Sequence, residues 1–161
     1  MAKGRFSIRA TISLLLIKDK EILLIRRFNT GWEDGRYSLM GGHLEEDETL
    51  AETTIREAKE EIGITLDPEN LKVVNTMHTS TNKRNYIDFF LVATKWKGKP
   101  VIKEKDKMDD IRWFPLNDLP GNMPQLIRNG IDNYIRNETF SEYKHTLKVQ
   151  TLSKKNIALS E

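Results

Sequence analysis

The stretch GGHLEEDETLAETTIREAKEEIGI, residues 41–64, joins a pair of glycines to an acidic segment with a helical pattern. Apolar residues recur at spacings of four, three and four, which predicts a helix over residues 48–62 with one face on a hydrophobic core. Gly63 follows at the position where a left-handed C-terminal cap belongs. The apolar positions are Ala51, Ile55, Ala58 and Ile62.

Three carboxylates of this helix raise a question of charge. Glu57, Glu60 and Glu61 lie within a sector of about 100° on the helix surface. Like charges at these spacings repel each other. A divalent cation would relieve that repulsion, and oxygen ligands without His or Cys favour Mg²⁺ or Mn²⁺ over zinc. The alternative is an ordinary solvated acidic face, which is common in proteins.

The basic residues of the helix are expected to leave this repulsion in place. Arg56 and Lys59 are predicted to project away from the three carboxylates. Arg56 is expected to reach back toward Glu52 or toward the loop around Glu48, because those positions are within reach of a long side chain.

The flanking sequence predicts strands on both sides of this helix. Alternating residues from Phe6 and the apolar run that ends at Ile17 indicate one strand, and residues 21–28 a second that pairs with it. Further strands are predicted over residues 71–79, 85–96 and 109–116. A second helix is expected over residues 124–137 with Pro124 in its first turn. Its inward residues are predicted to be Leu126, Ile127, Ile131, Tyr134 and Ile135.

This order of elements predicts an α/β fold with a mixed sheet covered by helices. The 161 residues suit a single domain over residues 1–140, followed by an extension of uncertain structure over residues 141–161. That extension is expected to be a frayed end or an added strand, since KHTLKVQTL alternates to some degree.

The composition excludes several classes of protein. A net charge of +2 with scattered basic residues gives no support to a nucleic-acid binder. No apolar run reaches the length of about 18 residues that a membrane span requires. The absence of Cys excludes disulfides and thiolate zinc sites, and it fits a reducing compartment, so a cytoplasmic location is expected. No partner other than a small molecule is expected, and the chain is predicted to be a monomer or a homodimer.

The segment from Gly42 to Ile64 resembles the Nudix box of the Nudix hydrolases, G-x5-E-x7-R-E-U-x-E-E-x-G-U, where U is apolar. All fixed positions match over 23 residues, although Ala58 is small for its position. The resemblance extends through the flanking strands, from about residue 6 to residue 137. It implies a Nudix-type α/β/α sandwich and a metal-dependent hydrolase of phosphoanhydrides, with Mg²⁺ or Mn²⁺ as cofactor.

The resemblance also implies roles for residues of the box. Glu57, Glu60 and Glu61 would be metal ligands, joined by the carbonyl of Gly42. Glu48 and Arg56 would hold the loop and orient Glu57. The alternative for the last two is a plain surface ion pair.

Other residues have weaker signals. Glu104 is similar to a further metal ligand or general base in some family members, while the alternative is a solvated loop with several lysines. Asn122 is similar to an Asn that binds a purine base, and its alternative is a turn or cap residue. Arg27 is a candidate for phosphate binding, with plain solvent exposure as its alternative. Trp32 and Tyr37 either stack on a substrate or pack at the edge of the core.

Two functional hypotheses remain at this point. The first is hydrolysis of a nucleoside diphosphate linked to another group, foremost a nucleoside triphosphate such as an oxidised dGTP. ADP-ribose, dinucleoside polyphosphates and non-nucleotide diphosphates are open alternatives within that class. The second is a ligand-binding regulator that uses the Nudix fold without turnover.

Overall fold

The computed structural model describes residues 6–145. Its elements follow the chain in an order that places one helix between two groups of strands and a second helix before the last strand. The strands are β1 (Arg9–Lys18), β2 (Glu21–Arg27), β3 (Tyr37–Ser38), β4 (Met40–His43), β5 (Lys72–Thr81), β6 (Asn85–Ala93), β7 (Met108–Pro115) and β8 (Phe140–His145). The helices are α1 (Leu50–Ile62), the 3-10 turn η1 (Pro68–Asn70) and α2 (Gln125–Arg136).

The sheet is mixed, as the sequence predicts, and strand β1 pairs with three other strands. β1 pairs in parallel with β6 along most of its length, while its beginning pairs with β4 and its end with β2, both antiparallel. β2 then pairs over its whole length with β7. The predicted pairing of the first two strands is therefore confirmed, but it covers only the two positions beside their turn.

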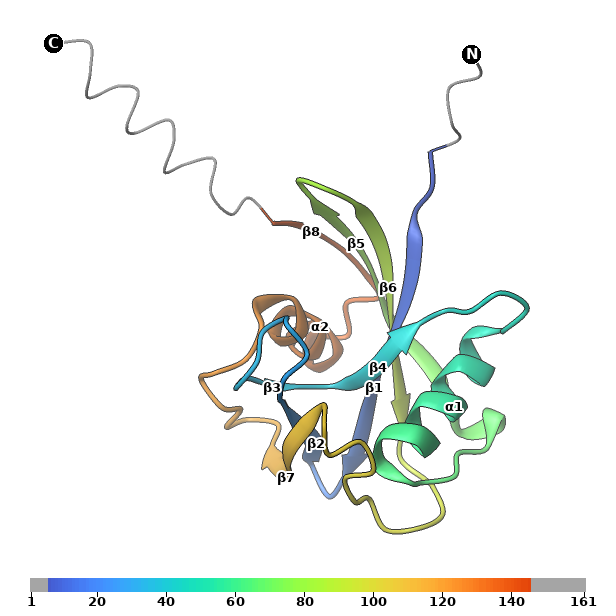
Figure 1. The fold of residues 1–161 in the computed structure, drawn as a ribbon, viewed down its shortest axis with the longest axis vertical. Coiled ribbons are helices and arrows are strands. Elements are labelled where there is room, and N and C mark those ends of the chain that lie inside the picture. The colour runs from blue at the N-terminus through green and yellow to red at the C-terminus, as the bar shows by residue number, and fades with distance from the viewer. Residues whose placement is uncertain (1–5, 146–161) are drawn as a thin grey trace, which may run out of the picture.

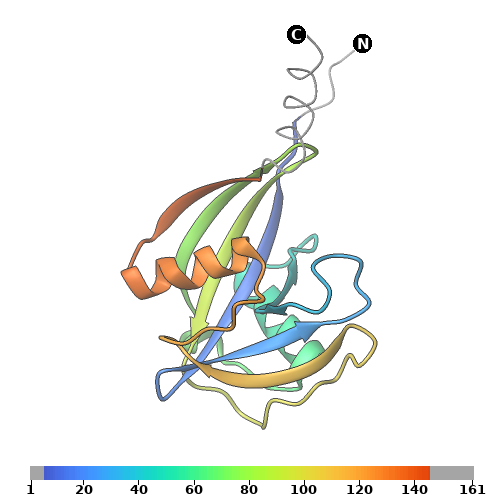
Figure 2. The ribbon, with the colours of Figure 1, turned by 90° about the vertical axis from the view of Figure 1, so that its left-hand side faces the viewer.

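The two helices lie on opposite sides of the sheet, and each covers its own core (Figures 1 and 2). Alternation along β1 divides its side chains between them: Leu14 and Leu16 face the core under α1, and Leu15 and Ile17 face the core under α2. The α2 helix packs closely because Gly130 lies against the Phe90 ring, where a β-carbon would overlap ring atoms. The predicted sandwich of helix, sheet and helix is confirmed.

Helix α1 has both of its predicted boundary signals. Thr49 caps the N-terminus in a reciprocal pair with Glu52, so the helix begins two residues later than predicted. Gly63 ends it in the left-handed conformation, with φ of 72°. The predicted apolar stripe faces the core, and both Ala58 and Ile62 are fully buried.

Helix α2 differs from prediction at its two ends. Pro124 precedes the first helical residue, and Asn137 ends the helix with φ of 57°. Ile135 was predicted to face inward, which is wrong: it is 47% exposed, because it lies on the side of the last turn that faces away from the sheet.

Strand β8 adds an edge to the sheet after α2, pairing in parallel with β5. It begins at Phe140, the last residue of the predicted domain, and the boundary at residue 140 stays a prediction. Most of the segment KHTLKVQTL lies outside the described residues. No helix among residues 6–145 is long and apolar enough to cross a membrane.

Candidate functional site

Two glycines in β4 bring helix α1 close to the backbone of the sheet. A β-carbon at Gly41 would overlap the carbonyl oxygen of Ile12 in β1, and one at Gly42 would overlap the Glu57 carboxylate. The missing side chain at Gly42 therefore leaves the space that the Glu57 carboxylate fills. The sequence predicted a role for Gly42 but none for Gly41, although the glycine pair was a visible signal.

Glu61 is the least neutralised of the three clustered carboxylates. Its Oε2 accepts a hydrogen bond of 3.1 Å from the backbone N–H of Gly41. Burial raises the pKa of Glu61 to about 8, and the negative charge of Glu57 adds to this rise. Burial and the neighbouring charge therefore disfavour the ionised form of Glu61.

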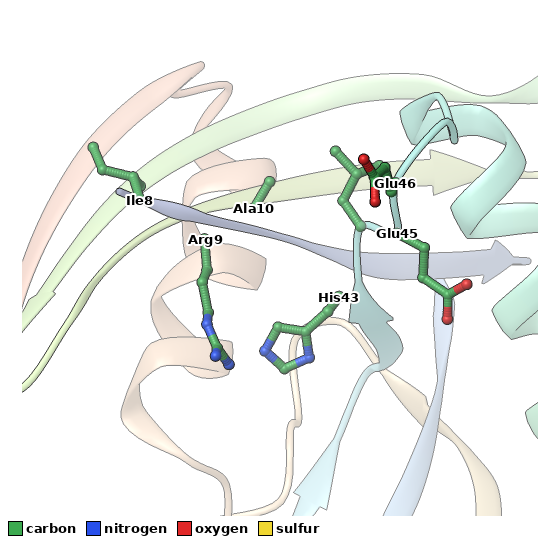
Figure 3. Close-up of a pocket in the computed structure, with 7 residues that line it drawn as sticks. Ile8, Arg9, Ala10, His43, Glu45 and Glu46 are labelled. Carbon is green, nitrogen blue, oxygen red and sulfur yellow. The ribbon is translucent and has the colours of Figure 1, made fainter. Parts of the chain in front are cut away.

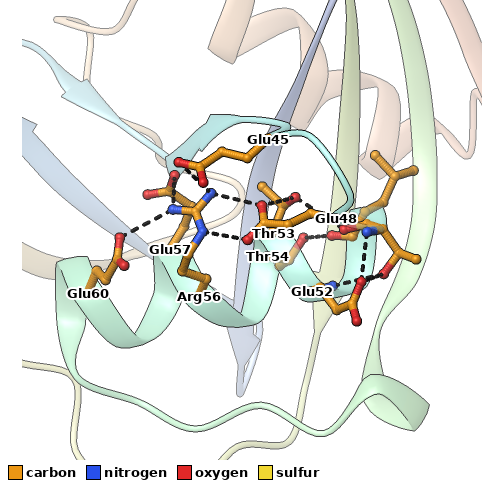
Figure 4. A network of polar contacts seen from close by, with 10 residues as sticks. Glu45, Glu48, Glu52, Thr53, Thr54, Arg56, Glu57 and Glu60 are labelled. Atoms are coloured by element: carbon orange, nitrogen blue, oxygen red, sulfur yellow. Dashed lines mark hydrogen bonds and ion pairs between the residues drawn. The ribbon is translucent and has the colours of Figure 1, made fainter.

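Arg56 contacts the carboxylates that it was predicted to leave alone (Figure 4). Its Nη1 donates to Glu57 at 2.9 Å and to Glu60 at 3.3 Å, so the prediction that it projects elsewhere is wrong. The guanidinium extends along the helix surface, which brings the neighbouring residue and the residue one turn later within its reach. Two of the three clustered acids thus share one positive charge.

The predicted contact between Arg56 and the loop at Glu48 is confirmed. Nε and Nη2 of Arg56 donate to the two Glu48 oxygens at 2.8 and 3.1 Å, a bidentate pair (Figure 4). This pair lowers the pKa of Glu48 to about 2. The Thr53 hydroxyl donates to the same carboxylate at 2.9 Å. Arg56 therefore connects the loop before α1 to Glu57, which is the geometry that its predicted orienting role requires.

Burial raises the pKa of Glu57 even though Arg56 opposes the shift through a hydrogen bond and its charge. The charges of Glu60 and Glu104 contribute to the rise. Glu104 also raises the pKa of Glu61. The structure thus places Glu104, which comes from the loop before β7, within electrostatic range of both α1 carboxylates.

Arg27 and Trp32 lie together at the end of β2. The Arg27 guanidinium stands 4.7 Å from the centroid of the Trp32 ring, and its Nε donates to the Trp32 carbonyl oxygen at 2.8 Å. Burial lowers the pKa of Arg27, and the charge of Glu61 opposes this shift. Arg27 is therefore a positive group beside the acidic cluster, and Trp32, 46% exposed, offers a ring next to it.

Tyr37 is buried at the edge of the core, whereas Asn122 is exposed and holds the loop before β3. Tyr37 is 6% exposed, its hydroxyl donates to Asp110, and its ring packs edge-on against Phe114 at 4.9 Å. This is the edge-of-core alternative, and it leaves no exposed ring face for stacking. Asn122 is exposed, and its Nδ2 donates to the Gly35 carbonyl at 3.1 Å.

The donor set suits a hard divalent cation, although the side chains are not converged around one point. Among residues 6–145, no three His, Asp or Glu side chains stand close enough together to hold a metal ion. Glu60 is turned toward Arg56, and its side chain is 52% exposed. Carboxylate oxygens from Glu57 and Glu61, beside the space at Gly42, nevertheless have the chemistry that Mg²⁺ and Mn²⁺ prefer. The chemistry of these oxygen donors fits such an ion, while Glu60 is paired with Arg56 in this structure.

A surface hollow lies beside the acidic cluster, between the start of β1 and the loop after β4 (Figure 3). The side chains of Arg9 and His43 point into the same space beside β1, and the Glu45 side chain points away from it. Glu45 also stands 3.8 Å from Arg56, so the hollow adjoins the cluster without containing its buried carboxylates.

Comparison with known families gives a match over most of the chain. The family model described as NUDIX domain matches residues 7–137. A crystal structure of a MutT NUDIX hydrolase from Burkholderia pseudomallei is similar, with a TM-score of 0.72 and 26% identity. That alignment covers 78% of this chain and 97% of the other.

Curated relatives share less of their length. An ADP-ribose pyrophosphatase from Methanocaldococcus jannaschii is 31% identical over 66% of this chain and 61% of its own. A NAD-capped RNA hydrolase from Pseudomonas entomophila is 28% identical over 70% of this chain and 38% of its own. The chain thus spans less than two thirds of the length of these relatives.

Proposed function

This chain belongs to the Nudix hydrolase family, and we propose that it is a metal-dependent pyrophosphohydrolase that cleaves a nucleoside diphosphate linked to another group. One observation carries the proposal. Glu57 and Glu61 are drawn against the Gly41–Gly42 backbone, and each has a raised pKa because neither burial nor mutual repulsion is fully offset. A folded protein tolerates such a pair when a cation joins it in the working state.

The residues of the site divide the work in this proposal. Glu57, Glu60 and Glu61 hold the cation, with the Gly42 carbonyl as a further ligand. Arg56 fixes the direction of Glu57 through its bidentate pair with Glu48. When bound, the ion neutralises diphosphate oxygens and lowers the pKa of bound water. Glu104, which acts electrostatically on both Glu57 and Glu61, serves as a further ligand or as the group that takes the proton.

The substrate end of the site lies toward the loop after β2. Arg27 supplies positive charge beside Glu61 for a phosphate oxygen, and the exposed Trp32 ring supplies a surface for a base. Asn122 uses its amide N–H to hold Gly35, which leaves its carbonyl oxygen as the acceptor for a donor on a base. The Tyr37 backbone N–H donates to the Asn122 carbonyl oxygen at 2.9 Å and so helps to hold Asn122 in place.

A nucleoside triphosphate such as an oxidised dGTP is the proposed substrate, with the nucleoside monophosphate as product. The resemblance of Glu104 and Asn122 to functional residues of some family members supports this choice. ADP-ribose is the second candidate, because an ADP-ribose pyrophosphatase is 31% identical to this chain. The relatives named NAD-capped RNA hydrolase keep open a substrate that carries nucleic acid, so its exclusion stays a prediction.

A substrate panel tests the proposal. The full chain is incubated with Mg²⁺ or Mn²⁺ and with nucleoside triphosphates including oxidised dGTP, ADP-ribose, NAD, a dinucleoside polyphosphate and NAD-capped RNA, and products are identified by mass. We expect cleavage of a phosphoanhydride and release of a monophosphate. Tight binding of one compound without turnover of any would support the non-catalytic regulator instead.

A further inference from the structure

Lys107 makes a close ion pair beside the acidic cluster. Its Nζ lies 2.8 Å from Oε1 of Glu104, three residues earlier in the loop before β7. The Glu104 side chain is 27% exposed and that of Lys107 is 54% exposed. The Glu104 side chain is therefore less accessible to water than the lysine side chain that pairs with it.

The backbone fixes where this pair can lie. The Glu104 carbonyl accepts hydrogen bonds from the N–H groups of Lys107 and Met108, at 3.0 and 3.1 Å. The Lys107 carbonyl accepts from the N–H of Phe28 at the end of β2, at 2.9 Å. Met108 is only 1% exposed, so a shift of this turn would bring a buried side chain into water.

The charge of Lys107 also reaches the cluster itself. Its positive charge lowers the pKa of Glu61, while Glu104 raises it. The two arginines nearby have other partners: Arg56 binds Glu48, Glu57 and Glu60, and Arg27 binds Thr30 and the Trp32 carbonyl. Among residues 6–145, Lys107 is thus the cation that forms an ion pair with Glu104.

We propose that Lys107 is a positioning residue that holds Glu104 beside Glu57 and Glu61 in the metal-free protein and competes with a divalent cation for the Glu104 carboxylate. The proposal rests on the proposed function, since it takes Glu104 to be a ligand. The ammonium group opposes binding of the ion, because two positive charges beside one carboxylate repel each other. Lys107 thereby sets how much free ion the site needs before it loads.

Binding of Mn²⁺ to the full chain without substrate tests this idea, followed by electron paramagnetic resonance. We expect Lys107→Met to bind Mn²⁺ two- to tenfold more tightly than the unchanged protein, up to about 1.4 kcal/mol. Lys107→Arg should restore the weaker binding. Lys105→Met is the matched control: it removes the same charge from the same loop, and Lys105 has no ion pair in the described part of the chain.

A double variant separates positioning from bulk charge. In a Glu104→Gln background, Lys107 has lost the carboxylate of its ion pair, so Lys107→Met should change Mn²⁺ affinity less than twofold. An equal gain with and without Glu104 would overturn the proposal, as would unchanged or weaker binding in Lys107→Met alone.

The outcomes also separate this proposal from the proposed function. If Glu57→Gln abolishes Mn²⁺ binding while Lys107→Met leaves the affinity unchanged, Lys107 has no competing role and the hydrolase proposal stands. If Lys107→Met tightens binding but no substrate is cleaved, the competition stands and the hydrolase proposal falls. A chain that binds no Mn²⁺ at all refutes both.

Discussion

At the scale of single residues, the repulsion among the α1 acids is only partly resolved within the protein. Arg56 offsets Glu48, Glu57 and Glu60, and it reaches all three because guanidinium groups donate in several directions. Glu61 receives one backbone hydrogen bond and keeps a pKa of about 8. The unresolved part of the repulsion therefore concentrates on Glu61.

The first prediction concerns the pH dependence of stability without metal. The folded Glu61 has a pKa of about 8 and an unfolded glutamate about 4.5, so between these values the folded state holds a proton that the unfolded state has lost. The free energy of unfolding should therefore fall as pH rises toward 8. Denaturant unfolding with a chelator at pH 6 and pH 9 measures this, and Glu61→Gln should flatten the slope. An equally steep slope in the variant would exclude Glu61 as the cause.

The second prediction concerns Glu57. Glu57→Gln should lower kcat by orders of magnitude because it removes a charged ligand, and it should leave the melting temperature of the metal-free protein unchanged or higher because it removes repulsion. Turnover assays and thermal melts with a chelator check the two effects. Glu69→Gln, at an exposed acid of η1, is the control and should alter neither. Near-normal turnover in Glu57→Gln would count against its assignment as a ligand.

The sequence predicted the identity of the acidic residues but not all of their contacts. Spacing along a helix determines which residues share a face, so the sector of Glu57, Glu60 and Glu61 was accessible from sequence. The direction of a long, flexible side chain depends on its partners in three dimensions, which is why the contact of Arg56 with Glu57 and Glu60 was missed. Lys107 was missed for the same reason.

At the scale of elements, two adjacent glycines of β4 let two different neighbours approach the strand closely. Gly41 faces the backbone of β1 and Gly42 faces the Glu57 carboxylate of α1. Both have backbone conformations that an alanine can adopt, because neither has a positive φ. Substitution at either position therefore tests space alone, and the consequence should differ between the two.

The third prediction compares Gly42→Ala with Gly41→Ala. In Gly42→Ala the flexible Glu57 side chain moves away, so kcat should fall roughly 10²-fold with little loss of stability. In Gly41→Ala the backbone of β1 must move, which should lower the free energy of unfolding by about 1–3 kcal/mol or more. Turnover and denaturant unfolding of both variants measure these effects. Equal loss of stability in the two would contradict the different roles assigned to them.

Elements with a regular pattern were predicted well, and those without one were not. Alternation revealed β1 and the apolar stripe revealed α1, since each pattern follows from the geometry of the element. The short β3 and β4 were not predicted, because strands of two and four residues are too brief to show a period. Burial of Tyr37 depends on Phe114 from β7 and was open for that reason.

At the scale of the whole molecule, pairings between distant segments determine where the site lies. The parallel pairing of β1 with β6 joins residues more than seventy positions apart, and no local pattern specifies it. It nevertheless divides the interior into the cores under α1 and α2. The acidic cluster lies on the α1 side of the sheet, whereas β8, the last described strand, is held by contacts on the α2 side.

A network of three polar side chains, of which the two asparagines are buried, makes this attachment. Asn75 in β5 donates to the Glu138 carbonyl at 2.9 Å and accepts from the Ser141 hydroxyl at 3.3 Å. Ser141 in turn accepts from Asn133 of α2 at 2.9 Å. Asn75 and Asn133 are 0% and 3% exposed, so their hydrogen bonds replace water that cannot enter. The network therefore ties α2 and β8 to β5.

The last prediction uses this network to separate stability from activity. Asn75→Ala leaves the Glu138 carbonyl and the Ser141 hydroxyl without these buried partners, which should cost about 1–3 kcal/mol. The melting temperature should then fall by about 2–4 °C for each kcal/mol. Because the change lies on the α2 side of the sheet, kcat measured well below the melting temperature should stay within twofold. Asn129→Ala, which removes only an exposed bond to Gln125, should not lower the melting temperature. A large loss of kcat in folded Asn75→Ala would mean that the two sides of the sheet are coupled.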